Sequence, residues 1–350
     1  LQNIALYTND SEWVTVDNAG NVGFGTTNAQ IAADSNNEKV INAGIVTANY
    51  VYGQLGGNSD SVRNTNVGTN AGDSFSGTDA TDNTLIGYDA GTAITSGDYN
   101  VAVGAKALDA NTTAANNTAV GAGALGANTT GTENTVVGSS AADSQTTASY
   151  NTIIGSVAGQ ALTTGGENTA VGRAAMYATT NGTQNTAVGG QALSSNTSGQ
   201  FNVAIGYKAL DNNTTASNNT ALGFKAADAL TTGDLNVAIG VDALGSATTA
   251  DRNVAVGKDA LAAYTASGDT YAVAIGFNAM GASTTASNCT AVGGSALAQN
   301  TTGTNNTALG INALTTNTTA SNNTAVGKSA LYANTTGAAN TALGSESLVA

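Results

Sequence analysis

The sequence predicts an all-β fold, a parallel β-solenoid (β-roll) built from coils of 17 residues. Three observations support this prediction: a phrase of the type NTAVG returns at a fixed spacing, β-branched residues alternate within it, and bulky residues are scarce. The 350 residues include no Pro, 44 Gly and only 5% aromatic residues, so no thick globular core is expected. A fixed internal period of this kind is typical of stacked repeat proteins.

The repeat is counted on the Gly that closes each phrase. Seventeen copies run from Gly68 to Gly344, spaced by 17 residues except for two steps of 19, which end at Gly87 and Gly276. The consensus is N-T-A-V-G-x-x-A-L-x-x-N-T-T-(G/A)-x-x, and its positions are called columns 1 to 17 below. Stacked at about 4.8 Å per coil, the copies predict a rod roughly 80 Å long.

Each column has an expected part in the coil. Alternation in columns 2 to 4 predicts a short strand that ends at the Gly of column 5, and a second short extended segment is expected near columns 8 and 9, with turns between them. Columns 2 and 4 are expected to face the core of the coil, and the Asn of column 1 is expected to form a hydrogen-bonded ladder. In two consecutive coils the expected ladder residues are Asn185, Thr186, Ala187, Val188, Gly189, Asn202 and Gly206.

Column 3 predicts association of several chains. It holds Ala in most coils, its only polar occupant is Asn66, and it is never charged. If columns 2 and 4 fill the coil's own core, column 3 points outward and needs another cover, for which a second copy of the chain is the simplest candidate. The thin coil also offers little apolar area to offset its ordering entropy. We therefore favour a homotrimer, intertwined or side by side, over a monomer.

The first 60 residues lack the repeat. We expect two domains, an irregular β segment over residues 1–60 and the solenoid over residues 61–350. Within the first, DNAGN at residues 17–21 is expected to form a hairpin turn. The chain begins with Leu1 and shows no basic start followed by an apolar stretch, as expected of a mature or trimmed product.

Two stretches resemble known families. The repeat, with its variant NVAIGYKAL at residues 202–210, is similar to the head repeats of YadA-like trimeric autotransporter adhesins, whose period is usually shorter. The segment SEWVTVDNAGNVGFGTT at residues 11–27 resembles one found in bacteriophage tail fibres, where such repeats follow it and a self-cleaving chaperone domain can close the chain. The second resemblance covers more of the sequence and implies a tail fibre.

Composition argues against several functions. A formal charge of −14, with nine Lys and Arg, disfavours nucleic acids and anionic membranes, and no apolar run is long enough for a membrane-spanning helix. Without His and with one Cys, Cys289, the chain has no nucleophilic triad, and we expect no enzyme activity, metal or other cofactor. The pairs Asp79 with Asp82 and Asp228 with Asp234 are expected to be solvated turn residues. The acidic loops at residues 91–98 and 265–270 lack the ligand spacing of a calcium site.

The predicted function is structural. We expect the shaft of a phage tail fibre or a similar extracellular appendage, located on a virion or cell surface, that presents or contributes to binding of a host-surface receptor, for which a glycan is a candidate. A bacterial trimeric surface adhesin head and an ice- or surface-binding solenoid are the alternatives. Side chains that vary between coils are the candidates for recognition, and those in column 6 are Tyr88, Tyr207, Phe224 and Phe277.

Overall fold

The computed structural model describes residues 4–8, 11–16, 22–24, 63–75 and 79–349. The chain forms two compact units, Leu1–Gln54 and Leu55–Ala350. In the first unit, β1 (Ile4–Thr8), β2 (Ser11–Val16) and β3 (Val22–Phe24) form an antiparallel sheet in the order β1-β2-β3. The turn expected at residues 17–21 lies outside the described residues.

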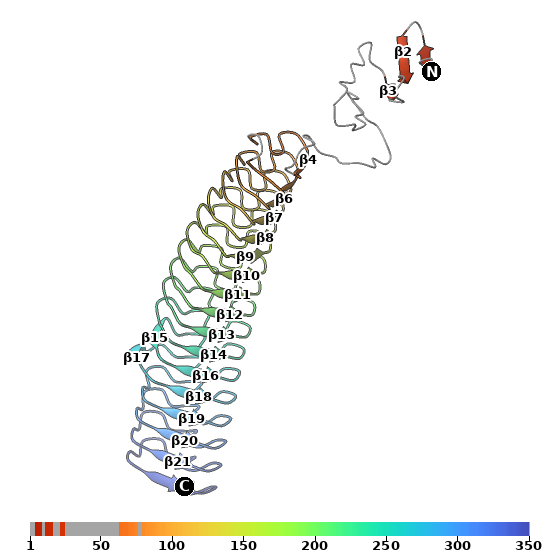
Figure 1. Ribbon diagram of the computed structural model, residues 1–350. Coiled ribbons are helices and arrows are strands. Elements are labelled where there is room, and N and C mark those ends of the chain that lie inside the picture. Colours follow the sequence, from red (N-terminus) through yellow and green to blue (C-terminus); the bar gives the residue numbers. More distant parts are fainter. Residues whose placement is uncertain (1–3, 9–10, 17–21, 25–62, 76–78, 350) are drawn as a thin grey trace. The chain divides into compact units, whose positions relative to one another are not determined.

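The second unit is a parallel β-solenoid, as the repeat predicts, and its described residues contain no helix. One three-residue strand per coil pairs in register with the strands of the coils before and after it, so the coils stack into a curved rod (Figure 1). The ladder strands are β4 (Thr65–Val67), β5 (Thr84–Ile86), β6 (Val101–Val103), β7 (Thr118–Val120), β8 (Thr135–Val137), β9 (Thr152–Ile154), β10 (Thr169–Val171), β11 (Thr186–Val188), β12 (Val203–Ile205), β13 (Thr220–Leu222), β14 (Val237–Ile239), β16 (Val254–Val256), β18 (Val273–Ile275), β19 (Thr290–Val292), β20 (Thr307–Leu309), β21 (Thr324–Val326) and β22 (Thr341–Leu343).

The interior of each coil is lined by columns 1, 3, 8, 9, 12 and 15. In the coil that starts at Asn185, the side chains of Ala187, Ala192 and Leu193 are fully buried, whereas Thr186 and Val188 are only partly buried. The expectation that columns 2 and 4 face the core and column 3 faces a neighbour is therefore wrong. The coil is too thin for two branched side chains from the strand, because the Leu of column 9 already fills most of the space.

Column 3 and column 9 share this space. Large residues stand in column 3 at Leu85 and Ile153, and in both coils column 9 is Gly. A Cβ on Gly91 would lie 2.8 Å from a methyl carbon of Leu85, and one on Gly159 would lie 3.4 Å from Ile153. Bulk is thus exchanged between the two columns, as close packing requires.

The segment of columns 6 to 11 is a compact turn, so the expectation of a second extended segment is also wrong. Gln191 and Leu193 have φ angles of 58° and 53°, in the left-handed region. Because the chain turns at each of them, the neighbouring side chains Ala192 and Leu193 both point inward and are fully buried. Consecutive residues of an extended strand would point to opposite sides.

The Asn side chains of column 1 form a buried ladder. The Asn202 side chain donates from Nδ2 to Asn185 Oδ1 at 3.1 Å and to the carbonyl of Ala216 at 2.8 Å, and its Oδ1 accepts from the Asn219 backbone N–H at 3.0 Å. Cys289 takes one place in this column: its Sγ lies 3.3 Å from the carbonyl of Gly303, and burial raises the pKa of the thiol. The ladder satisfies backbone groups that the thin coil hides from water.

Column 12 is a second buried column, and its Asn residues are less uniformly paired. Asn128 donates to Asn111 Oδ1 and to the carbonyl of Gly131, but neither amide atom of the fully buried Asn213 has a partner among the described residues. The next coil carries Leu230 in the same column. An unpaired buried amide destabilises the folded state.

We therefore expect Asn213→Leu to raise the free energy of unfolding by about 1 kcal/mol, because the variant removes the unpaired amide and keeps a similar volume. Denaturant unfolding monitored by circular dichroism checks this. Asn128→Leu is the matched control, and it should destabilise because it breaks three buried hydrogen bonds. A loss of stability in Asn213→Leu equal to that of the control would contradict the prediction.

Both 19-residue coils carry an aromatic residue in column 12, Phe75 and Tyr264. Tyr264 is fully buried and its hydroxyl donates to the carbonyl of Ala286 at 2.7 Å. The coils on either side offer Ala247 and Ser283 in the same column. The two additional residues lengthen the coil around this ring, on the side away from the ladder, where β15 (Thr249–Asp251) pairs with β17 (Ser267–Asp269) (Figure 1).

Candidate functional site

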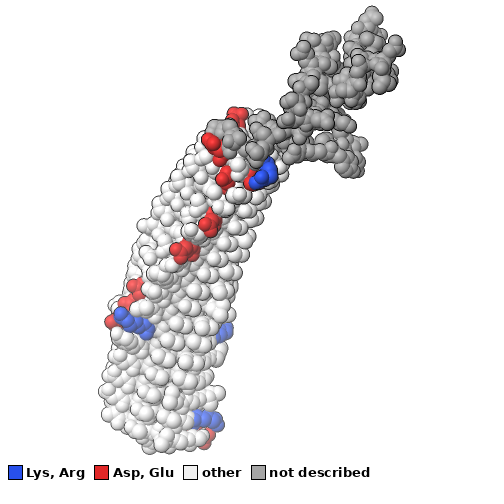
Figure 2. Space-filling model, in the orientation of Figure 1, with Lys and Arg blue, Asp and Glu red and all other residues white. Residues whose placement is uncertain are grey.

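The outer face of the ladder repeats the same kinds of residue along the length of the solenoid. Columns 2 and 4 point outward there, and neither holds a charged residue in any of the seventeen coils. Large aliphatic side chains of column 4 are 36% to 78% exposed at Val67, Ile86, Ile154, Ile205, Leu222, Ile275, Val292, Leu309 and Leu343. On the face seen in Figure 2, charged side chains form a few separate groups on a surface that is otherwise uncharged.

The four predicted recognition residues are all exposed, but the structure brings only two of them together. The rings of Tyr207 and Phe224 stack with a centroid distance of 5.7 Å and an interplanar angle of 20°. Tyr88 and Phe277 lie on coils farther along the ladder in either direction. All four are between 47% and 59% exposed, and column 6, which flanks the aliphatic residues of column 4, also holds cations at Arg173, Lys258 and Lys328.

Cations and carboxylates accompany the stacked pair. Lys208 Nζ lies 6.0 Å from the Tyr207 ring centroid and 3.1 Å from an Asp211 carboxylate oxygen. The hydrogen bond and charge of Asp211 raise the pKa of Lys208. One coil later, Lys225 is 5.9 Å from the Phe224 centroid and 3.9 Å from Asp228. Each lysine is thus paired with its own carboxylate, so the net charge of the cluster is zero. The cluster therefore has no electrostatic attraction for a charged ligand.

Column 17 holds further exposed aromatic residues that sequence reasoning missed. Their exposed fractions range from 51% to 57%, and they are Tyr99, Tyr150, Phe201 and Tyr271. Column 17 has left-handed backbone, as at Phe201 with a φ of 57°, so the alternation of the strand does not predict where its side chains point. Columns 6 and 17 thus edge the Thr and aliphatic centre of the outer face with aromatic side chains interspersed with charged ones, such as Arg173 and Glu167.

The acidic pairs have structural contacts. Asp82 forms an ion pair with Arg63 at 2.5 Å, which lowers the pKa of Asp82. Asp234 Oδ1 accepts from the backbone N–H of Ser217, one coil earlier, at 2.6 Å. Burial raises the pKa of Asp228, against the opposing effect of Lys225. The described residues contain no group of three or more His, Cys, Asp or Glu side chains that could hold a metal ion.

Comparison with known proteins adds no assignment: neither a protein-family model nor a curated protein sequence matches this chain. Within the described ranges, no helix has the length and apolar character needed to cross a membrane. The surface itself is therefore the basis for any functional argument.

Proposed function

We propose that this chain is the shaft of an extracellular fibre of the phage tail-fibre type, which holds or contributes to a receptor-binding region. The observation that carries the proposal is the uninterrupted parallel ladder of seventeen strands. A ladder of this number at about 4.8 Å per strand spans roughly 80 Å. Such a solenoid provides length and stiffness, and its function requires no reacting group.

We further propose that three copies associate through the outer face of the ladder. The support is the uncharged character of columns 2 and 4 along the whole length of the rod and the exposed aliphatic side chains of column 4. A strip about 80 Å long and 10 Å wide offers about 800 Å² per chain, which each chain of a trimer would share between its two neighbours. Because all copies have the same coil spacing, the side chains of one copy can fit between the side chains of successive coils in the next copy. Three such faces can close around a common axis.

The test is a double variant, Ile205→Asp with Leu222→Asp. Wild-type protein is expected at about three times the chain mass of 34.1 kDa by native mass spectrometry. Two carboxylates per chain in the contact should shift the protein to monomers, because burying unpaired charge is costly. Both positions are exposed in the single chain, so circular dichroism should be unchanged.

The matched control places the same two charges on the same coils but away from the ladder face. Asn212→Asp with Thr232→Asp changes exposed residues of columns 11 and 14. This control should keep the wild-type mass. A wild-type monomer of 34.1 kDa, or equal dissociation of both double variants, would contradict association through this face.

The same face supports a second candidate, binding to ice or another crystalline surface. Thr stands in column 2 in twelve of the seventeen coils, and it alternates with the methyl groups of column 4 on a regular, outward-facing array. This function needs a free face, whereas the fibre buries it. A monomer that inhibits ice recrystallisation would favour the second candidate over the trimeric fibre.

A further inference from the structure

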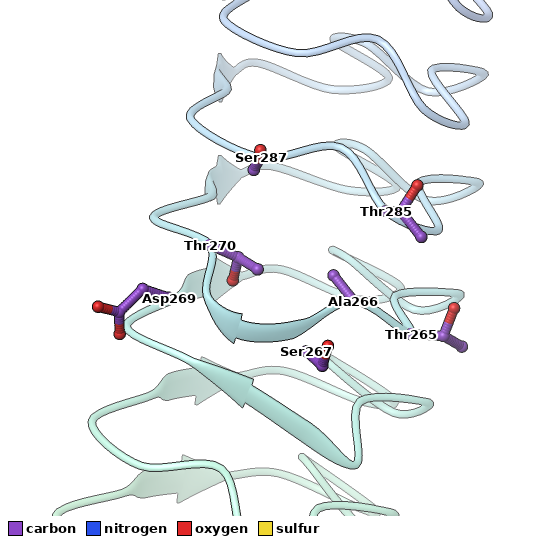
Figure 3. Close-up of a pocket in the computed structure, with 7 residues that line it drawn as sticks. All are labelled: Thr265, Ala266, Ser267, Asp269, Thr270, Thr285 and Ser287. Carbon is purple, nitrogen blue, oxygen red and sulfur yellow. The ribbon is translucent and has the colours of Figure 1, made fainter.

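A polar groove lies where the regular stacking of the solenoid is interrupted. It has a volume of about 320 Å³ and lies between β17 of the 19-residue coil and the coil that follows. Figure 3 shows Asp269 at one end of the groove and Thr265 with Thr285 at the other, with Ser267 and Thr270 between them. The volume is at the lower end of that of small-molecule sites, about 300–1,000 Å³.

The lining is dominated by neutral oxygen atoms. Five of the seven lining residues carry hydroxyl groups, and only Asp269 is charged; the lining consists of Thr265, Ala266, Ser267, Asp269, Thr270, Thr285 and Ser287. The Thr270 hydroxyl donates within the protein, to Asn253 Oδ1 at 2.7 Å. Ser267 and Thr285 are exposed and Ser287 is half-buried, so a ligand can reach these hydroxyl groups, which can both donate and accept.

A fixed ion pair adjoins the groove. Asp269 is paired with Arg252, and the Tyr271 hydroxyl donates to Asp269 Oδ2 at 3.3 Å. The guanidinium carbon of Arg252 lies 5.9 Å from the Tyr271 ring centroid, so the cation has a second contact within the protein. Tyr271 belongs to column 17, beside the outer face of the ladder, and does not line the groove.

We propose that this groove binds a neutral saccharide unit. Hydroxyl groups that donate and accept match the hydroxyls of a sugar ring. An anion is disfavoured because the only charged lining residue is acidic and Arg252 is already paired. The polar lining also disfavours an apolar ligand.

The groove remains accessible in the proposed fibre. It is formed by columns 13 to 16, and β15 and β17 lie on the side of the coil away from the ladder strands (Figure 1). Saccharide binding here would deepen the proposed function, since it would make the shaft itself a contributor to receptor binding. Only the biological role of saccharide binding rests on the proposed function. Chain association and sugar binding are measured in separate experiments, so either can fail without the other.

The test uses the full chain and defined sugars. Galactose, glucose, mannose and N-acetylglucosamine, with N-acetylneuraminic acid as the anionic comparison, are screened by saturation-transfer NMR at about 10 mM, enough to occupy most of a site with a Kd of about 1 mM. At least one neutral sugar is expected to bind. Its Kd is then measured by titration.

Two pairs of variants locate the site. Thr285→Trp fills the groove and should weaken binding at least about tenfold, while Thr302→Trp changes the same column one coil later and should leave the Kd unchanged. Thr285→Val, with Thr302→Val as control, removes one hydroxyl at constant shape and should weaken binding about threefold or more, so the test stands even if the Trp variant misfolds. Binding of no sugar, of the anionic sugar alone, or with equal affinity in variants and controls would overturn the proposal.

Discussion

Gly189→Ala is expected to destabilise the solenoid by about 4 kcal/mol or more, or to prevent folding. Gly189 has a φ of 135°, a region that residues with a Cβ rarely adopt. A Cβ on it would also lie 2.6 Å from the carbonyl oxygen of Gly206 in the next coil. The carbonyl oxygen belongs to the backbone of the next coil, and the Cβ would be fixed to the backbone of its own coil. Because these backbones are closely stacked, no side-chain movement relieves the contact. Thermal and denaturant unfolding monitored by circular dichroism measure the loss.

The neighbouring residue provides a matched control. A Cβ on Gly190 would meet Tyr207 ring carbons at 3.5 Å and 3.8 Å and the Arg173 carbonyl oxygen at 4.0 Å, all ordinary van der Waals contacts, and column 6 already holds Ala at Ala105 and Ala122. Gly190→Ala should therefore change the free energy of unfolding by less than about 1 kcal/mol. If both variants lost the same stability, the close approach of column 5 glycines would not be what limits this position.

The strand, its register and the stacking could be predicted from the sequence because each depends on the period. NTAVG at residues 185–189 marks a strand and its end, and in-register pairing of Thr186 with Val203 follows from equal spacing of the coils. The turn of columns 6 to 11 could not be derived in this way. It depends on left-handed backbone at Gln191 and Leu193, residues that show no sequence preference for that conformation.

The orientation of the strand was predicted wrongly, although the sequence held a signal for it. Where column 3 holds a large residue, column 9 of the same coil holds Gly, as in the pairs Leu85 with Gly91 and Ile153 with Gly159. A large residue in one column that requires a small one in the other indicates that the two side chains are in contact. The prediction instead took the larger aliphatic residues of column 4 as the core. The larger residues of a strand do not face the core in a coil this thin, because Ala is the largest residue that fits opposite the Leu of column 9.

The functional surfaces could be predicted from the sequence only in part. Exposure of Tyr207 and Phe224 was expected from their variable column, but their stacking needed the register of two coils. The polar groove at Thr285 could not be placed from sequence, because it arises between two loops whose shapes depend on the buried ring of Tyr264. Only the location of the irregular coil was evident from the 19-residue step.

Asn202→Ala is expected to lower the free energy of unfolding by about 3 kcal/mol, because each buried group left without its partner costs about 1–3 kcal/mol. The Asn202 amide contacts Asn185 Oδ1, the Ala216 carbonyl and the Asn219 backbone N–H, all within the buried ladder. Asn212→Ala, at an exposed position of the same coil where the side chain donates to the Asp228 carbonyl, should cost less than about 1 kcal/mol.

Hydrogen exchange distinguishes this prediction from a general loss of stability. A solenoid is held together by contacts between neighbouring coils, so damage at one rung should be felt most at the coils beside it. In Asn202→Ala, protection of the Asn219 N–H should fall well below that of the corresponding Asn134 and Asn323 N–H groups, several coils away, whose Asn acceptors are unchanged. Uniform loss of protection along the rod would mean that the ladder acts as one cooperative unit, and the local account of its amides would be wrong.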